Sequence, residues 1–248
     1  MIIEAVEDGI SILTISTDKR NTLKGEDLDE FLTKLKVTGS SNTVKGIIVT
    51  GTGNVFSTGG NISTLLSLDS DSRIIEFFRK LDEILIFLFS FDKPFIAAVN
   101  GHSIGAGFLI QLCADVTIIP ENKKIKFGLP ELKIGLSIDA IMRDLITFNN
   151  IGMRKLGSLI YSGALFDATK AGELGIIDEE VDESELIGKS KSIINELVKD
   201  DLFPFMINKR VLRETTIRSM NGSFNEEKYR IFVELLNNEK TKQKLRAI

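Results

Sequence analysis

The sequence predicts an α/β fold, and two observations carry that prediction. First, "GIIVTG" at 46–51 and "FIAAVNG" at 95–101 are continuous apolar runs bounded by Gly or Pro, the pattern of strands buried on both faces. Second, the segment between them, from about 72 to 90, has apolar residues every three or four positions, which indicates a helix. A strand, a helix and a further strand in this order need a crossover connection, so the sheet should be largely parallel.

The N-terminal region predicts a hairpin followed by a helix. Residues 2–6 and 10–16 are β-prone, and Asp8-Gly9 between them is a turn signal. From 25 to 36 the apolar positions recur at helical spacing; they are Leu28, Phe31, Leu32 and Leu35.

The remaining elements continue the alternation and then become mainly helical. Residues 104–114 are expected to form a helix, and "DVTIIP" at 115–120 a third buried strand. Beyond about residue 139 helical patterns dominate, apart from "GIIDEEV" at 175–181. Near the C-terminus an apolar stripe must pack on the chain's own core or on a neighbouring subunit; it consists of Tyr229, Phe232, Val233 and Leu236.

Composition restricts the classes of function. The 248 residues suit one domain or one domain with a helical appendage, and 43% hydrophobic content supplies a sizeable core. A net charge of −4 argues against a dedicated nucleic-acid binder. With one cysteine, Cys113, and one histidine, an internal disulfide is excluded and an ordinary metal site nearly so.

The sequence also predicts no membrane association and a cytoplasmic protein. The N-terminus lacks the basic and apolar regions of a signal peptide. The densest apolar segment, 84–91, is far shorter than the roughly 20 residues that span a bilayer.

The stretch "GHSIG" at 101–105 fits the G-x-S-x-G pattern of a hydrolase nucleophile. The only histidine, His102, directly precedes Ser103, whereas a hydrolase triad needs a histidine later in the chain. We therefore interpret Ser103 as a small residue in a crowded turn and His102 as a structural histidine.

Two glycine-rich stretches, "GTGNVFSTGG" and "GHSIGAGF", each follow a predicted buried strand. Neither has the spacing of a dinucleotide or P-loop motif. Glycines at strand ends do let backbone N–H groups approach a ligand closely. Two such stretches could direct two N–H donors at one carbonyl oxygen, which would form an oxyanion hole.

These segments resemble the crotonase, or enoyl-CoA hydratase/isomerase, superfamily. The resemblance rests on "IIVTGTGNVFSTGGNIS", "KPFIAAVNGHSIGAGFLIQLCAD", "FGLPELKIGL" and the stretch from 151 to 181. It implies a spiral of repeated ββα units over residues 1–190 and a helical C-terminal trimerisation region over 191–248. It further implies a homotrimer or a dimer of trimers that acts on an acyl-CoA thioester, with CoA as part of the substrate and no separate cofactor.

Carried over by position, the resemblance places the oxyanion hole at the backbone N–H groups of Gly60 and Ala106. Arg20 and Thr22, in "KRNTL", are expected beside the pantetheine or phosphates of CoA, although Arg20 also reads as a solvated surface charge. The other residues expected around the substrate are Thr58, Gly59, Asn61, Ile62, Gly105, Leu109, Pro130 and Gly135.

Two departures from the family pattern bear on the reaction. Hydratases of this superfamily carry two glutamates; here the first position is Leu109 and the second is Glu131. The glycine-rich run usual after the second glutamate is "LSIDAIMRD", which contains Asp139. In addition, the family's usual Asp after the first oxyanion donor is Asn61, a change expected to alter only local hydrogen bonding.

One carboxylate suits isomerisation better than hydration. Adding water needs one group to orient and deprotonate it and another to protonate carbon, whereas one base can move a proton from C2 to C4. Glu131 with Leu109 therefore favours conversion of 3-enoyl-CoA to 2-enoyl-CoA, as in mitochondrial-type Δ3,Δ2-enoyl-CoA isomerases, which this pattern resembles.

Two alternatives remain at this point. Asp139 could enter the pocket and support hydration together with Glu131, but the sequence favours a place in the first turn of a helix. The protein could instead be a non-catalytic CoA- or RNA-binding member of the superfamily, although its lysines form no basic stripe.

Overall fold

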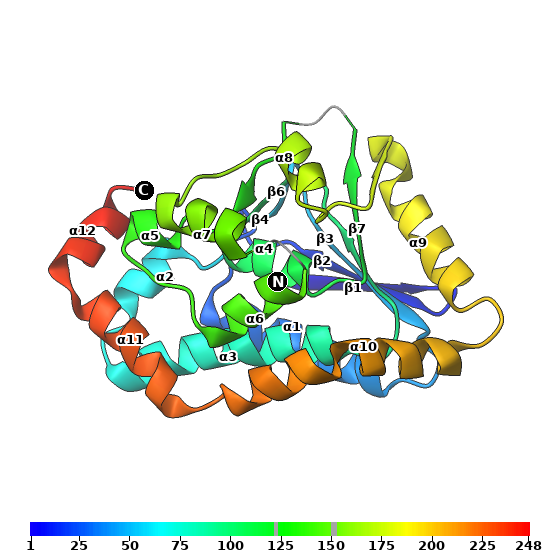
Figure 1. Cartoon of the computed structure of the whole chain (residues 1–248), viewed down its shortest axis with the longest axis horizontal. Coiled ribbons are helices and arrows are strands. Elements are labelled where there is room, and N and C mark those ends of the chain that lie inside the picture. The colour runs from blue at the N-terminus through cyan, green and yellow to red at the C-terminus, as the bar shows by residue number, and fades with distance from the viewer. Residues whose placement is uncertain (122–123, 150–152) are drawn as a thin grey trace.

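A computed structural model describes residues 1–121, 124–149 and 153–248, and a six-stranded sheet lies at its centre (Figure 1). The strand order is β1-β2-β3-β5-β7-β9, with β1 antiparallel to β2 and every other pair parallel, so the α/β prediction is confirmed. The strands are β1 Ile2–Glu7, β2 Ile10–Ile15, β3 Gly46–Gly51, β5 Phe95–Ala98, β7 Val116–Pro120 and β9 Glu179–Val181.

The predicted hairpin joins β1 and β2. Asp8 and Gly9 both have positive φ, +51° and +76°, as the two central residues of a tight hairpin turn require. Glu7 and Ile10 face each other directly across this turn, so the Asp-Gly pair sets the register of the whole hairpin.

A second, three-stranded parallel sheet was missed by the sequence analysis. It has the order β4-β6-β8. Its strands have only two or three residues each, too few for any periodicity to be detected, and one of them occupies the start of the helix expected over 104–114. They are β4 Val55–Ser57, β6 His102–Ile104 and β8 Phe127–Gly128.

Helices cover both faces of the large sheet. The main core lies under α1, α3 and α4, whereas α9 packs on the opposite face through Leu186 and Ile194 (Figure 1). The expected helices are confirmed, although α1 runs four residues past its predicted end. The helices up to the middle of the chain are α1 Gly25–Ser40, α2 Ile62–Ser67, α3 Asp71–Ser90, α4 Ala106–Leu112, α5 Glu131–Ile134 and α6 Ala140–Phe148.

Beyond α6 the described chain is mainly helical, as expected, apart from β9. Its helices are α7 Met153–Ser162, α8 Ala168–Glu173, the 3₁₀ turn η1 Glu183–Glu185, α9 Leu186–Leu197, α10 Leu202–Gly222, α11 Glu226–Asn237 and α12 Glu239–Arg246. Residues 151 and 152 of the family-like stretch lie outside the described residues. The domain boundary predicted after residue 190 falls within α9. No helix of the described chain is both long enough and apolar enough to cross a bilayer.

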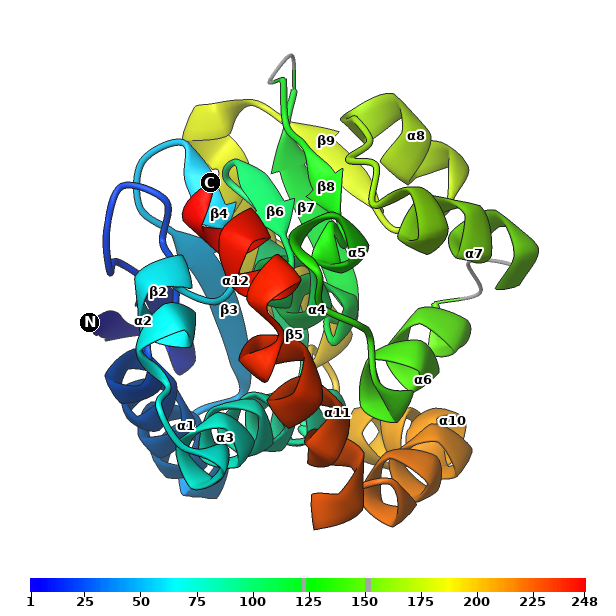
Figure 2. The same cartoon turned by 90° about the vertical axis from the view of Figure 1, so that its left-hand side faces the viewer.

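The C-terminal stripe packs on the chain's own core. Helix α11 runs along α3, and α12 contacts both α2 and α5 (Figure 2). Tyr229, Phe232 and Leu236 are buried there, and the ring of Phe232 stacks on that of Phe78 with centroids 3.9 Å apart.

A buried group of charges ties α11 to α3 and α6. Lys228 Nζ lies 2.5 Å from Asp82 Oδ2 and 3.0 Å from Asp139 Oδ2, and all three side chains are at most 11% exposed. Burial, together with the neighbouring charge of Asp139, raises the pKa of Asp82 to about 7. Both carboxylates therefore depend on Lys228 for compensation.

We expect Lys228→Met to lower the free energy of unfolding by about 3–5 kcal/mol at pH 8, because it leaves buried carboxylates without a cation. The loss should shrink at pH 5, where Asp82, whose pKa is raised to about 7, takes up a proton. Urea denaturation at both pH values measures it.

Arg230→Met, at an exposed position on the same helix, is the matched control and should change stability by less than about 0.5 kcal/mol. Equal effects of the two substitutions would contradict the compensating role of Lys228.

Candidate active site

The loops that follow β4 and β6 approach each other closely. Gly59, at φ +86°, lies so near α4 that a Cβ on it would be 2.8 Å from the backbone N of Ala106. Gly105, also with positive φ, is the residue directly before α4. Glycine at position 59 therefore makes this contact between the two loops sterically possible.

The backbone N–H groups of Gly60 and Ala106 are left without acceptors by this arrangement. Leu23 N–H donates to Gly59 O at 2.8 Å, and Asn61 N–H donates to Leu23 O at 2.9 Å. Because N–H groups alternate along an extended segment, that of Gly60 faces the other way. Ala106 is the first residue of α4, where the N–H has no partner within the helix. Neither N–H donates to an acceptor in the described part of the chain.

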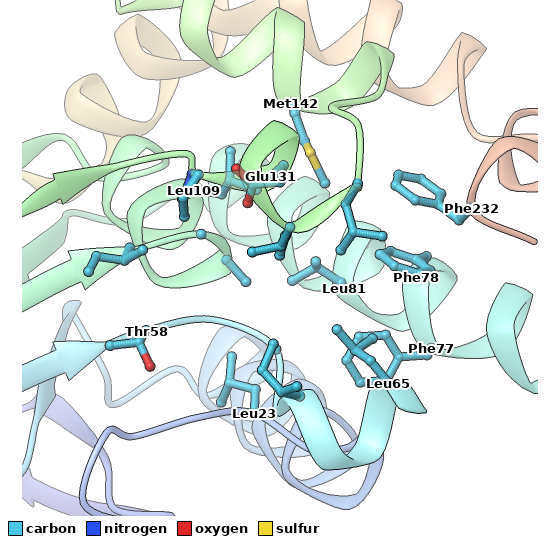
Figure 3. Close-up of a pocket in the computed structure, with 18 of the residues that line it drawn as sticks. Leu23, Thr58, Leu65, Phe77, Phe78, Leu81, Leu109, Glu131, Met142 and Phe232 are labelled. Carbon is cyan, nitrogen blue, oxygen red and sulfur yellow. The ribbon is translucent and has the colours of Figure 1, made fainter. Parts of the chain in front are cut away.

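Both residues line an elongated, mainly apolar pocket with about 690 Å³ of space not filled by atoms, its open mouth included (Figure 3). A volume of this order suits a small-molecule site. The pocket is lined by Leu23, Leu28, Thr58, Gly60, Ile62, Leu65, Phe77, Phe78, Leu81, Ile104, Gly105, Ala106, Leu109, Pro130, Glu131, Ile134, Leu136, Ser137, Met142 and Phe232.

Glu131 is the one carboxylate among these lining residues. It is the first residue of α5, and its Oε1 lies 3.4 Å from the position that a Cβ on Gly105 would occupy. Its Oε2 is buried and has no hydrogen-bond partner among the described residues. Burial in apolar surroundings raises the pKa of this carboxyl to about 7, which suits a group that exchanges protons near neutral pH.

Most of the predicted site residues meet in this pocket: Thr58, Gly60, Ile62, Gly105, Ala106, Leu109, Pro130 and Glu131. Gly59 lies behind them. Arg20, Thr22 and Asn61 line an adjacent surface cavity together with Lys19 and Arg246. Asn61 caps α2 and its Nδ2 donates to Thr22 Oγ1 at 2.8 Å, so its side chain has a local hydrogen-bonding role, as expected.

Gly135 and Asp139 line neither the pocket nor the adjacent surface cavity. Gly135 ends α5 at φ +83° and packs against Thr241 of α12. Helix α12 comes so close that a Cβ at position 135 would clash with Thr241. Asp139 caps α6: its Oδ1 accepts the Met142 N–H at 2.9 Å while Oδ2 pairs with Lys228. The helix-start interpretation of Asp139 is confirmed, and the structure does not bring its carboxylate to that of Glu131.

The Ser103 and His102 pair is structural. Ser103 is fully buried in β6, and His102 Nδ1 accepts the backbone N–H of Lys126 at 3.0 Å. Adjacent residues of a strand point to opposite faces, so the imidazole does not reach the Ser103 hydroxyl. The nucleophile interpretation is thereby excluded.

Sequence reasoning missed the apolar walls of the pocket. They come from α1, α2, α3, α6 and α11, and the residues are Leu28, Leu65, Phe77, Phe78, Leu81, Met142 and Phe232. Several of these carried a helical-periodicity signal, which predicts a buried face and does not distinguish a pocket wall from a core.

The chain is similar in sequence to known proteins along almost its whole length. A family model described as "Enoyl-CoA hydratase/isomerase" matches residues 5–247. The chain is 24% identical over 209 residues to mouse "Enoyl-CoA delta isomerase 1, mitochondrial", covering 84% of this chain and 72% of the relative. It is 28% identical over 246 residues to a "Probable enoyl-CoA hydratase" of Bacillus subtilis (strain 168), covering 98% and 93% of the two chains.

The fold is similar to that of human mitochondrial delta3-delta2-enoyl-CoA isomerase. The TM-score is 0.91 at 21% identity, over 99% of this chain and 95% of the other.

We expect Glu131→Gln to raise the midpoint of thermal unfolding at pH 8. A carboxyl whose pKa rises from about 4.3 in the unfolded chain to about 7 in the fold costs stability once the pH exceeds the unfolded value, and the cost is complete above pH 7. The gain should therefore fall steeply at pH 5, as differential scanning calorimetry can measure.

Glu234→Gln, at an exposed position, is the control and should leave the midpoint unchanged at both pH values. A Glu131→Gln protein no more stable than the wild type at pH 8 would show that the Glu131 carboxylate finds compensation in solution.

Proposed function

The chain belongs to the enoyl-CoA hydratase/isomerase family, and we propose that within it the protein is a Δ3,Δ2-enoyl-CoA isomerase. The observation that carries the proposal is a single pocket carboxyl, that of Glu131, whose Oε2 is buried and unpartnered, together with Leu109 at the position where a second acid would stand. The unpaired N–H groups of Gly60 and Ala106 supply an oxyanion hole.

In the proposed reaction the thioester oxygen of 3-enoyl-CoA accepts hydrogen bonds from the N–H groups of Gly60 and Ala106. The Glu131 carboxylate takes a proton from C2, and the electron pair of that C–H bond delocalises into the thioester as a dienolate. Loss of one oxyanion-hole donor costs about 2.7–4 kcal/mol in other enzymes, so two donors provide much of the stabilisation. The carboxylic acid then returns the proton to C4, and the double bond moves from C3–C4 to C2–C3.

Leu109 is the reason to prefer isomerisation. It is fully buried in α4 and contributes only a hydrocarbon side chain to the pocket wall. Hydration would need a second group to manage the water proton. Asp139 is the alternative that the sequence offered, but both of its carboxylate oxygens are engaged by the α6 N-terminus and Lys228.

The adjacent surface cavity suits the CoA portion of the substrate. Lys19, Arg20 and Arg246 line it together with one acidic side chain, Asp18, so cations outnumber carboxylates among the lining side chains and favour phosphate groups. Thr22 and Asn61 add two hydrogen-bonded polar side chains to its lining. We assign Arg20 to the CoA phosphates on this basis.

We also propose that the protein assembles as a homotrimer. Helix α10 presents an exposed apolar stripe of Phe203, Ile207, Val211 and Leu212, and large contiguous apolar surface of this kind marks an interface. The stripe is separate from α11, whose residues Tyr229, Phe232 and Leu236 are buried within the same chain.

We expect Glu131→Gln to lower kcat/KM for 3-hexenoyl-CoA about 10²- to 10⁴-fold, because the amide cannot accept the C2 proton. In the wild-type protein kcat/KM should rise with pH and level off above about pH 7, since the base must be ionised. Formation of 2-enoyl-CoA, followed by its absorbance, measures both.

Hydration of 2-hexenoyl-CoA is assayed in parallel. The isomerase proposal fails if purified wild-type protein at high concentration does not convert 3-hexenoyl-CoA, or if it hydrates 2-hexenoyl-CoA faster. In the latter case loss of hydration in Asp139→Ala would assign the second acid to Asp139.

We expect Leu212→Asp to dissociate the trimer, because it introduces a charge into the apolar stripe. Light scattering after size-exclusion chromatography should give the monomer mass for this variant and three times that mass for the wild type. Ser219→Asp, also exposed on α10, should leave the trimer intact. A monomeric wild-type protein would refute the assembly.

A further inference from the structure

One end of the pocket holds the Glu131 carboxyl, and the other end is lined by aromatic side chains. In Figure 3, Thr58, Leu109 and Glu131 lie toward one side, whereas Leu65, Phe77, Phe78 and Phe232 gather at the other. A thioester held by the Gly60 and Ala106 N–H groups would therefore direct its acyl chain toward the aromatic residues. We call Phe77, Phe78 and Phe232 the aromatic wall.

The aromatic wall begins close to the oxyanion donors. A Cβ on Gly60 would lie 3.5 Å from Phe77 Cζ and 3.6 Å from Leu65 Cδ1, which is ordinary van der Waals contact. Little space thus separates the N–H that binds the thioester oxygen from the first ring of the wall.

The rings of the wall hold one another in place. Phe78 and Phe232 stack with centroids 3.9 Å apart and an interplanar angle of 9°, and Phe77 meets Phe78 edge to face at 5.5 Å. All three side chains are buried. Moving one ring to admit a longer chain would break its contacts with the others, and close-packed interiors resist such displacement.

The segment that carries Phe232 is itself anchored. Lys228 precedes Phe232 by one helical turn on α11, and its ion pairs with Asp82 and Asp139 join that turn to α3 and α6. The anchor keeps the ring of Phe232 against Phe78 and makes α11 a fixed end of the pocket.

Resting on the proposed isomerase function, we propose that the aromatic wall restricts the substrate to short-chain 3-enoyl-CoA thioesters and that Phe232 is the residue that sets the limit. Phe232 is placed for this role because it lines the aromatic end of the pocket from α11, across from Phe77 and Phe78 of α3 (Figure 3).

A second cavity offers the competing route. It shares Glu131, Leu136 and Ser137 with the pocket and continues past Ile138 and Ile160. A chain that took this route would not meet Phe232, so the two routes predict different effects of substitution.

The experiment compares kcat/KM for 3-dodecenoyl-CoA and 3-hexenoyl-CoA in wild type and Phe232→Ala. The wild type should favour the shorter substrate at least tenfold. Phe232→Ala should raise the ratio of long to short at least tenfold, mainly by lowering KM for the longer substrate. Ile231→Ala, the exposed neighbour on α11, should leave the ratio unchanged.

Phe232→Leu is included because it removes the ring with a smaller loss of packing, and it should give an intermediate ratio. Calorimetric titration with hexanoyl-CoA and dodecanoyl-CoA repeats the comparison without turnover. If the protein does not isomerise 3-enoyl-CoA but still binds hexanoyl-CoA more tightly than dodecanoyl-CoA, the proposed reaction is refuted and the proposed role of the aromatic wall is supported.

Three outcomes would overturn the proposal. The wild type could accept both chain lengths equally in turnover and binding, or Phe232→Ala could reduce activity on both by the same factor. The third outcome is that Ile160→Ala raises the ratio of long-chain to short-chain kcat/KM and Phe232→Ala does not. That result would place the acyl chain in the second cavity.

Discussion

The arrangement of the site depends on one steric constraint, the close approach of the loops that follow β4 and β6. Gly59 lies against the backbone N of Ala106, and a Cβ on Gly107 would come within 2.3 Å of Ser57 O. Side chains at these positions would force the two loops apart. The unpaired N–H groups of Gly60 and Ala106 would then face different regions. The small sheet sets this geometry, because parallel pairing of β4 with β6 brings both loops to the same edge.

The reactive carboxyl follows from the same packing. Glu131 begins α5 directly after β8, the third strand of the small sheet, so its side chain enters beside Gly105. The surrounding residues are apolar, and the shift of its pKa to about 7 has burial as its main cause. The features that make the carboxyl a competent base at neutral pH therefore oppose its ionisation in the folded protein. A partner that removed this cost would also remove the basicity that the proposed reaction uses.

The sequence allowed the large sheet and the long helices to be predicted, because their signals are local. Continuous apolar runs marked β3, β5 and β7, and three- to four-residue spacing marked α1 and α3. The second sheet was missed because strands of two or three residues have no period. Gly135 was expected beside the substrate, whereas its position is determined by contact with α12, more than a hundred residues away. The pocket walls share this difficulty, since a residue that faces a pocket and one that faces the core have the same helical spacing.

The C-terminal helices form part of the pocket, a role that the family resemblance alone does not reveal. The resemblance assigned residues 191–248 to assembly, but α11 also completes the pocket through Phe232 and contributes the cation that neutralises Asp82 and Asp139. Asp139 in turn caps α6, which carries the pocket residue Met142. One lysine thus holds together three helices that each supply part of the pocket wall. A buried cation with two carboxylates is a costly way to join helices, and hydrophobic residues of similar volume often stabilise more. The directional ion pairs of Lys228 fix the orientation of α11 on α3. Apolar side chains alone would define this orientation less closely, because they can pack in several ways. The distance between Glu131 and Phe232, at the two ends of the pocket, depends on this fixed orientation of α11.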